Sequence, residues 1–374
     1  MTAPRHADGG RLGIAALALA AIALSACSST QQVSHQRMMA PVNMEVAERR
    51  EVAVVEFTGE GGQQISDRLA ATLENVRLNG QPVFRVDGPV RLHRGRHASI
   101  GNVDRADALD YARSVGAGAV VMGQADFDTD TQLREPDVSE SCVTRDQLGN
   151  CVKTAIEIRQ CVDITVSLTY AAEALDTATG SPIYNRRPGD LKDRTTECLS
   201  TGDNPALLIT RLMNNDFERS VAGLRNQLIA RAAADIHRDI APYAETFQVA
   251  FLREPDTATG AAAAEFEQAN DLVGAGQAEA ACAVWQRMAR SGVSDLALSY
   301  NLAACAENSG NYRAAMEAYD AVDTMIFRMP RSGGGDPNYD LEDWAGLLSA
   351  ARGRVARLHE SEETLAVFAG APSF

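Results

Sequence analysis

The stretch IEIRQCVDITVSLTY (residues 156–170) decides the fold class, because it alternates apolar and polar side chains along almost its whole length. The apolar side chains that face one way are those of Ile156, Ile158, Val162, Ile164, Val166, Leu168 and Tyr170. Alternation with a period of two predicts a strand with one buried face. The sequence DTATG (176–180) follows, and its turn-forming residues predict that the chain folds back there.

Shorter patterned segments lie on both sides of this strand. Further strands are expected at EVAVVEF (51–57), PVFRVD (82–87), 117–128 and TFQVAFL (246–252), and helices at about 63–80, 104–115 and 205–240. This order predicts an α/β domain over residues 51–252, in which helices pack on a mixed sheet.

Four segments of this domain resemble a known pair of families. VAVVEFTGEGGQQISDRLAATL, FRVDG, ALDYARSVGAGAVVMGQADFD and VSLTYAAEALDTATGSPI look like the domain shared by LpoB-like peptidoglycan-synthase activator lipoproteins and CsgG-like curli secretion lipoproteins. The shared features are a strand ending in a small-residue loop, a helix, a GA-containing strand and a D-x-x-TG turn. The resemblance covers about residues 51–252 and implies an α/β fold that contacts a membrane-bound machine.

An internal repeat of 34 residues follows Pro255. Ala269 matches Ala303, Gly276 matches Gly310, Ala281 matches Ala315, and Trp285 matches Tyr319. This period, with small residues where helices touch, is typical of tetratricopeptide (TPR) repeats. Residues 258–374 are therefore expected to form an all-α, TPR-like domain, in which 341–360 supplies an atypical capping helix or pair.

The N-terminus resembles a bacterial lipoprotein signal. Arg5 and Arg11 precede a short apolar run, and Leu24-Ser25-Ala26-Cys27 is similar to a lipobox. The resemblance implies a signal peptide over 1–26, acylation of Cys27 and a membrane anchor, and Ser28 implies sorting to the outer membrane. A plain secretory signal is the alternative. Residues 27–50 show no periodicity and are expected to be a short tether.

The other six cysteines are even in number, as disulfide pairing in an oxidising compartment requires. They are Cys142, Cys151, Cys161, Cys198, Cys282 and Cys305. The first two flank a turn sequence, the next two lie at equal distances from Thr179-Gly180, and the last two fall on adjacent helices of the repeat. We expect these three pairs to be disulfides. The alternative is six buried free thiols.

Charged groups indicate few ligands. Acidic residues outnumber basic ones by 50 to 35, which disfavours nucleic acid as a partner. The one dense basic stretch, RLHRGRHASIG (91–101), offers Arg91, Arg94 and Arg96 to a carboxylate-bearing partner, or is simply a solvated loop. No metal site or cofactor is expected.

The repeats suggest a second partner site. Stacked helix pairs form a concave surface, and Asn301 and Glu307 are placed on it among alanines. The Asn301 amide can bond an extended backbone with both a donor and an acceptor. The alternative is that Asn301 pairs internally.

No catalytic motif occurs, so we expect a non-enzyme without a small-molecule substrate. The leading hypothesis is a periplasm-facing outer-membrane lipoprotein that binds envelope proteins as an assembly factor in peptidoglycan synthesis or secretion. The alternative is a CsgG-like subunit of an outer-membrane secretion channel. The returning segment 185–197, charged on both faces, disfavours the channel. An enzyme with an unrecognised site is a third class.

Overall fold

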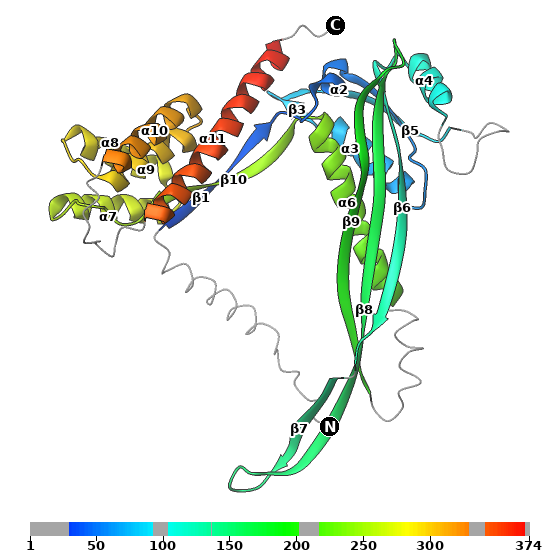
Figure 1. Cartoon of the computed structure of the whole chain (residues 1–374), viewed down its shortest axis with the longest axis horizontal. Coiled ribbons are helices and arrows are strands. Elements are labelled where there is room, and N and C mark those ends of the chain that lie inside the picture. The colour runs from blue at the N-terminus through cyan, green and yellow to red at the C-terminus, as the bar shows by residue number, and fades with distance from the viewer. Residues whose placement is uncertain (1–29, 93–103, 136, 202–216, 329–340, 371–374) are drawn as a thin grey trace, which may run out of the picture. The chain divides into compact units, whose positions relative to one another are not determined.

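The computed structural model describes residues 30–92, 104–135, 137–201, 217–328 and 341–370 (Figure 1). The chain divides into two compact units. The α/β unit comprises residues 40–243, and the helical unit combines 30–39 with 244–370. A mixed sheet with packed helices and a C-terminal helical region, both expected from the sequence, are therefore present.

The sheet of the α/β unit has six strands in the order β5-β2-β6-β8-β7, with β9 also paired to β8. Their bounds are β2 Glu51–Val55, β5 Arg85–Val90, β6 Ala119–Leu133, β7 Asp137–Arg145, β8 Cys151–Asp176 and β9 Pro182–Thr201, and the hairpin of β3 (Arg77–Leu78) and β4 (Gln81–Pro82) lies apart from them. Strand β2 is parallel to β5 and β6, whereas β8 is antiparallel to β6, β7 and β9. The sheet is therefore mixed.

Strand β8 is 26 residues long and contains the whole alternating stretch 156–170. One edge of β8 pairs first with β7 and then with β6, and the other pairs with β9 (Figure 1). The segment 185–197, whose charges argued against a membrane strand, lies within β9. Its charged side chains do not prevent a strand, because its backbone pairs with β8 on both sides of a bulge at residues 187–188.

Three helices cover the sheet. Helix α4 (Arg105–Ser114) packs its alanines against Ala53, Val55 and Met122. The alternate positions of β2 and β6 are also fully buried, because α3 (Gly62–Glu74) packs there and contacts α6 (Phe217–Ile240). Helix α6 lies along β8 and β9.

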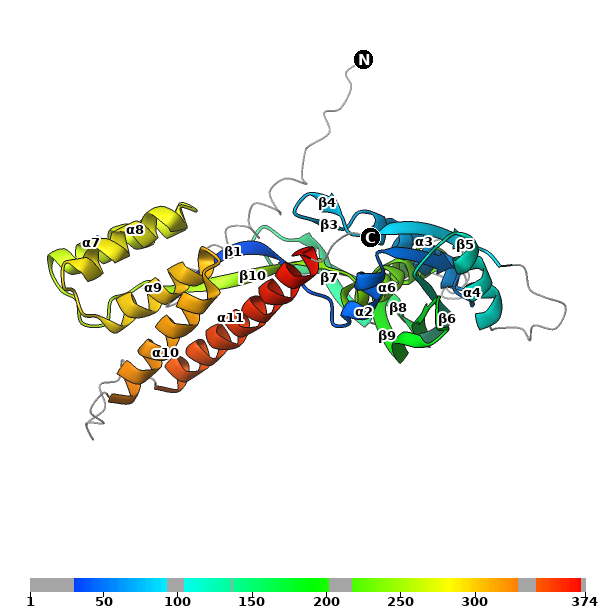
Figure 2. The ribbon, with the colours of Figure 1, turned by 90° about the horizontal axis from the view of Figure 1, so that it is seen from above.

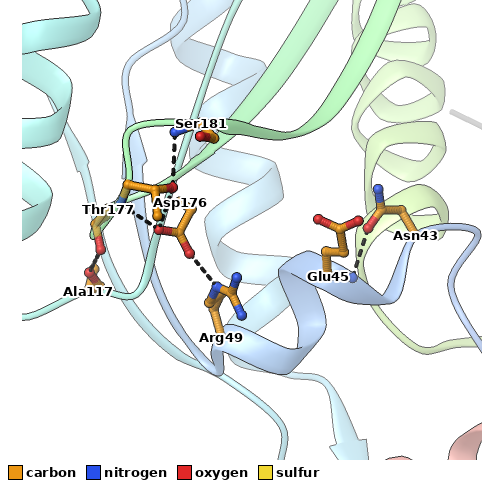
Figure 3. A network of polar contacts seen from close by, with 8 residues as sticks. Asn43, Glu45, Arg49, Ala117, Asp176, Thr177 and Ser181 are labelled. Atoms are coloured by element: carbon orange, nitrogen blue, oxygen red, sulfur yellow. Dashed lines mark hydrogen bonds and ion pairs between the residues drawn. The ribbon is translucent and has the colours of Figure 1, made fainter.

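The turn between β8 and β9 is fixed by a polar network (Figure 3). Asp176 accepts hydrogen bonds from the Thr179 N–H at 2.8 Å and from the Arg49 Nε at 2.8 Å. The Thr177 hydroxyl donates to the Ala117 carbonyl at 2.6 Å. The Thr179 bond and then Arg49 hold the pKa of Asp176 below its ordinary value. The turn expected at 176–180 is thus tied to α2 (Met44–Arg49) and to the start of β6.

Within the expected tether 27–50, the described residues 30–50 are structured. Strand β1 spans Thr30–Met39, and α2 follows after its N-cap residue Asn43. The alternating burial of β1 was hidden in the sequence because several of its inward-facing residues are polar. Such residues are tolerated inside only where another part of the chain supplies partners.

The helical unit consists of two helix pairs, a long helix and a two-stranded ribbon (Figure 2). The helices are α7 Ala261–Gly274, α8 Ala278–Arg290, α9 Leu296–Asn308, α10 Tyr312–Arg328 and α11 Leu341–Gly370. Trp285 and Tyr319, which are equivalent in the 34-residue repeat, are both fully buried. The segment 341–360 belongs to the single helix α11 rather than to a helix pair.

The strand expected at 246–252 exists as β10 (Tyr243–Leu252), but it pairs with β1. The α/β unit therefore ends at residue 243, nine residues before the expected boundary at 252. The physical reason is that β10 buries Phe247, Val249 and Phe251 in the helical unit.

Three disulfides are present, and they join the expected pairs. Cys142 bonds Cys151, Cys161 bonds Cys198, and Cys282 bonds Cys305, with Cα–Cα distances of 5.7, 4.1 and 5.7 Å. The second pair is opposed directly in the β8–β9 register, which two bulges between the turn and this pair set.

Candidate functional site

The far end of β8 forms a two-stranded arm with β7. We define the arm as residues 137–159, the β7–β8 hairpin. Strand β9 ends at Thr201, which pairs with Ile158, so that within the described chain residues 151–157 pair only with β7. Figure 1 shows this hairpin extending past the other strands of the sheet. A two-stranded hairpin without a packed face is marginally stable in water, and the Cys142–Cys151 disulfide closes this one near its tip.

One face of β8 changes from buried to exposed along its length. Under α6, the side chains of Ile164, Val166 and Leu168 are at most 1% exposed. In the first turn of α6, Ser220 donates a 2.6 Å hydrogen bond to Glu197 on β9. Farther out on the same face, Ile156 is 63% exposed. The alternation in the sequence therefore continues beyond the helix that covers it.

The arm and its approach carry most of the exposed large apolar side chains of the described chain. Seven of eleven lie there: Leu133, Val138, Val143, Leu148, Val152, Ile156 and Ile158. In the register, Val138 is paired with Ile158, and Glu140 with Ile156, so Val138 and Ile156 share one face. We call Val138 and Ile156 the apolar face of the arm. Val138 is 60% exposed and Ile156 63% exposed, so most of each side chain is open to contact by a partner.

Sequence reasoning missed this face. It included Ile156 and Ile158 among the buried residues, because periodicity alone does not reveal where a covering helix begins. The available signal is the length of the alternation. Fifteen residues of strand span about 50 Å, more than a short helix covers.

The basic stretch is only partly described. Arg94 and Arg96 lie outside the described residues. Arg91 makes a two-pronged ion pair with Glu56, with Nε–Oε2 and Nη2–Oε1 distances of 2.6 and 2.8 Å. The hydrogen bonds to Glu56 raise the pKa of Arg91. Arg91 is therefore engaged within the α/β unit rather than held ready for a partner.

Asn301 recognises an extended backbone, but that backbone belongs to the same chain. Its side chain is fully buried. It accepts from the Leu252 N–H at 2.7 Å and donates to the Leu252 carbonyl at 2.9 Å. The expectation that Asn301 lines an open groove is corrected, because β10 occupies the position that an external peptide was expected to take.

Glu307 is also internal. It is fully buried and accepts a hydrogen bond from the Tyr319 hydroxyl at 2.9 Å. Arg354 of α11 forms a two-pronged ion pair with it, in which Nε and Nη2 donate to Oε1 and Oε2. Its expected role on a partner-binding surface is corrected for the same reason. A buried carboxylate is retained only when its charge is paired and hydrogen-bonded.

Aromatic packing fills the rest of this helical surface. Phe251 of β10 stacks on Trp285 with ring centroids 5.4 Å apart, and Phe266 of α7 packs on Trp285 at 5.9 Å. The ribbon is thus a packed part of the helical unit. An external peptide has no vacant groove at this place.

Other chemistry has little support in the part of the chain that the structure describes. Those residues contain no group of three metal-ligating side chains, and no helix among them is long and apolar enough to cross a bilayer. Cys27 lies outside the described residues.

Comparisons with known proteins give no family. No family model matches the chain, and no curated protein matches it. Among solved structures, the lipoprotein GNA1162 from Neisseria meningitidis is 13% identical with a TM-score of 0.18, covering 46% of this chain and 98% of its own. A neuraminyllactose-binding hemagglutinin homologue from Helicobacter pylori is 10% identical with a TM-score of 0.17, covering 52% and 92%. At such TM-scores neither structure supports an argument about this chain.

Proposed function

We propose that this chain is an outer-membrane lipoprotein, facing the periplasm, that binds other envelope proteins as an assembly factor. The single observation that carries the proposal is the apolar face of the arm, Val138 and Ile156. Burying a side chain of this size against a partner contributes about 1.5–3 kcal/mol. The proposed partner is a protein with a complementary apolar surface.

Two further observations support this compartment and role. The lipobox-like sequence at 24–27 supports acylation of Cys27, and three disulfides are typical of exported proteins. We propose no catalytic activity and no small-molecule substrate for the chain, and the α/β unit is proposed to contact a machine of peptidoglycan synthesis or secretion.

Site-specific photo-crosslinking in intact cells tests the proposal. A photoreactive residue replaces Ile156, and a matched variant carries it at Ala155, the exposed neighbour that points to the opposite face. We expect an adduct with another envelope protein from position 156 and little from position 155. Equal yields at both positions, or none at either, would contradict a binding role for the arm.

A secretion-channel subunit is the second candidate, and one observation favours it. Segment 185–197 pairs with β8 as a long strand despite its charges. If the chain is one of many copies in a channel, the photoreactive residue at position 156 should crosslink copies of this chain to one another. The adducts would then form a ladder of multimers. The same experiment therefore distinguishes the two functions.

A further inference from the structure

Strand β1 is clamped by the helical unit along its length. Near its start, the Gln31 amide, in the orientation its neighbours require, donates to the Asn270 carbonyl at 3.1 Å and accepts from the Gly274 N–H at 2.9 Å. Near its end, Arg37 donates to the Asn308 carbonyl at 2.9 Å. The strand is thus part of the folded helical unit and does not lengthen a flexible linker after Cys27.

Only two residues, Ser28 and Ser29, lie between the expected acylation site and the start of this strand. Consecutive Cα atoms are 3.8 Å apart, so the Cα atom of Cys27 lies within about 11 Å of that of Thr30, whatever path the chain takes. A flexible tether of about 23 residues has a root-mean-square length of about 25 Å. Acyl chains on Cys27 therefore hold the first residues of β1 close to the headgroups.

The contacts of Gln31 place the end of α7 beside the start of β1. The turn before α8, residues 274–277, follows directly. Between Asp271 and Glu279 this turn has no charged side chain. The chain carries a formal net charge of −15, and anionic headgroups repel acidic surfaces, which favours contact through an uncharged turn over contact along a whole side of the unit.

We infer that the α7–α8 turn rests on the lipid headgroups and that β1 leads away from the bilayer. This inference rests on the proposed function, because it takes Cys27 as acylated. The membrane is then a second partner of the protein, with residues 274–277 of the helical unit as the contact.

The repeat supplies a matched control position. Gln277 and Asn311 are 34 residues apart, both are exposed, and both follow a glycine of positive φ, 76° at Gly276 and 84° at Gly310. Arg37, which contacts the turn at 308–310, is six residues beyond Gln31 along β1, a distance of about 20 Å. Equivalent turns therefore differ in their expected height above the bilayer.

Fluorescence quenching in vesicles tests the inference. The acylated full-length mature protein carries a fluorescent non-natural residue at position 277 or 311, in vesicles of phosphatidylethanolamine and phosphatidylglycerol with a quencher on the lipid headgroup. We expect quenching at position 277 to exceed that at 311 by about twofold or more, given the difference of about 20 Å. Inserting about 20 glycine and serine residues after Ser28 should abolish the difference while the protein stays membrane-bound.

The outcomes separate the inference from the proposed function. Acylated, membrane-bound protein with equal quenching at both positions overturns the inference and leaves the anchor intact. A difference that survives the inserted spacer also overturns it, because the short link is then not its cause. A chain that carries no acyl group on Cys27 overturns the anchor and the inference together, and mass spectrometry of the N-terminal peptide reveals this.

Discussion

Glu307 and Arg354 form a buried ion pair. Removing one partner should lower the free energy of unfolding of the helical unit far more than removing both charges. Glu307 is fully buried and the Arg354 side chain is 16% exposed. The change Glu307→Leu leaves the guanidinium without its counter-ion, at a cost of about 3–5 kcal/mol. It also removes the acceptor of the Tyr319 hydroxyl, which costs about 1 kcal/mol more.

The double variant Glu307→Leu/Arg354→Leu is the informative comparison. It removes both charges and fills their place with apolar groups, so we expect a net loss of only about 0–2 kcal/mol in the free energy of unfolding. The double variant should thus be more stable than the single variant. The chain from Ser28 onward, which lacks Cys27, is suited to the measurement.

Tryptophan fluorescence during guanidinium chloride unfolding provides the assay. The chain has two tryptophans, Trp285 and Trp344, and both lie in the helical unit, so their emission reports that unit alone. This matters because a chain of two units need not unfold in one step. The reasoning is refuted if Glu307→Leu costs less than about 1 kcal/mol, or if the double variant is as unstable as the single one.

Two further predictions use the same assay. Asn301→Ala leaves the N–H and carbonyl of Leu252 without their partner, so the free energy of unfolding of the helical unit should fall by about 2–4 kcal/mol. The control Gln277→Ala, at an exposed position, should change it by less than about 0.5 kcal/mol. Equal effects would contradict the buried role of Asn301. Burial, and then the Arg37 cation, lower the pKa of His35 below 6.5, with Glu307 and Arg354 also acting on it. Because the unfolded chain binds this proton more readily, stability should fall as the pH decreases below about 6.5, and His35→Leu should flatten that dependence. His237 lies in the α/β unit, so His237→Leu should leave the pH dependence of the tryptophan transition unchanged. If His237→Leu flattens that pH dependence and His35→Leu does not, the assignment to His35 is refuted.

Regular alternation and turn symmetry made much of the α/β unit predictable. The period of two in 156–170 predicts β8, because a half-buried strand needs that pattern. The pairing of Cys161 with Cys198 was predicted from their equal distances to 179–180, but two bulges contribute to it. Near the turn Leu175 pairs with Pro182, so an unbroken hairpin would place Cys161 opposite Thr196, and the bulges shift it to Cys198. The strand follows from local periodicity, whereas the bulges are not visible in it.

Polar residues whose partners are distant in sequence were not predictable. Asn301 bonds Leu252, 49 residues away, and Gln31 contacts a helix more than 200 residues later. Taken alone, each resembles a surface residue, because polar side chains are usually exposed. The burial of Asn301 and the existence of β1 follow only once the two ends of the helical unit are brought together.

The order of the disulfides has a consequence for how the protein is made. Taken in chain order, the bonded cysteines are joined as consecutive pairs that do not interleave, first 142 with 151, then 161 with 198, and then 282 with 305. A chain that is threaded through a translocation pore from its N-terminus presents these thiols one pair after another. An oxidant that joins each newly exported cysteine to the free cysteine before it therefore produces the native disulfides directly. Reshuffling of wrong disulfides, which takes seconds to hours, is then not needed. Biogenesis of this protein should then depend on a disulfide-forming enzyme but not on a disulfide isomerase.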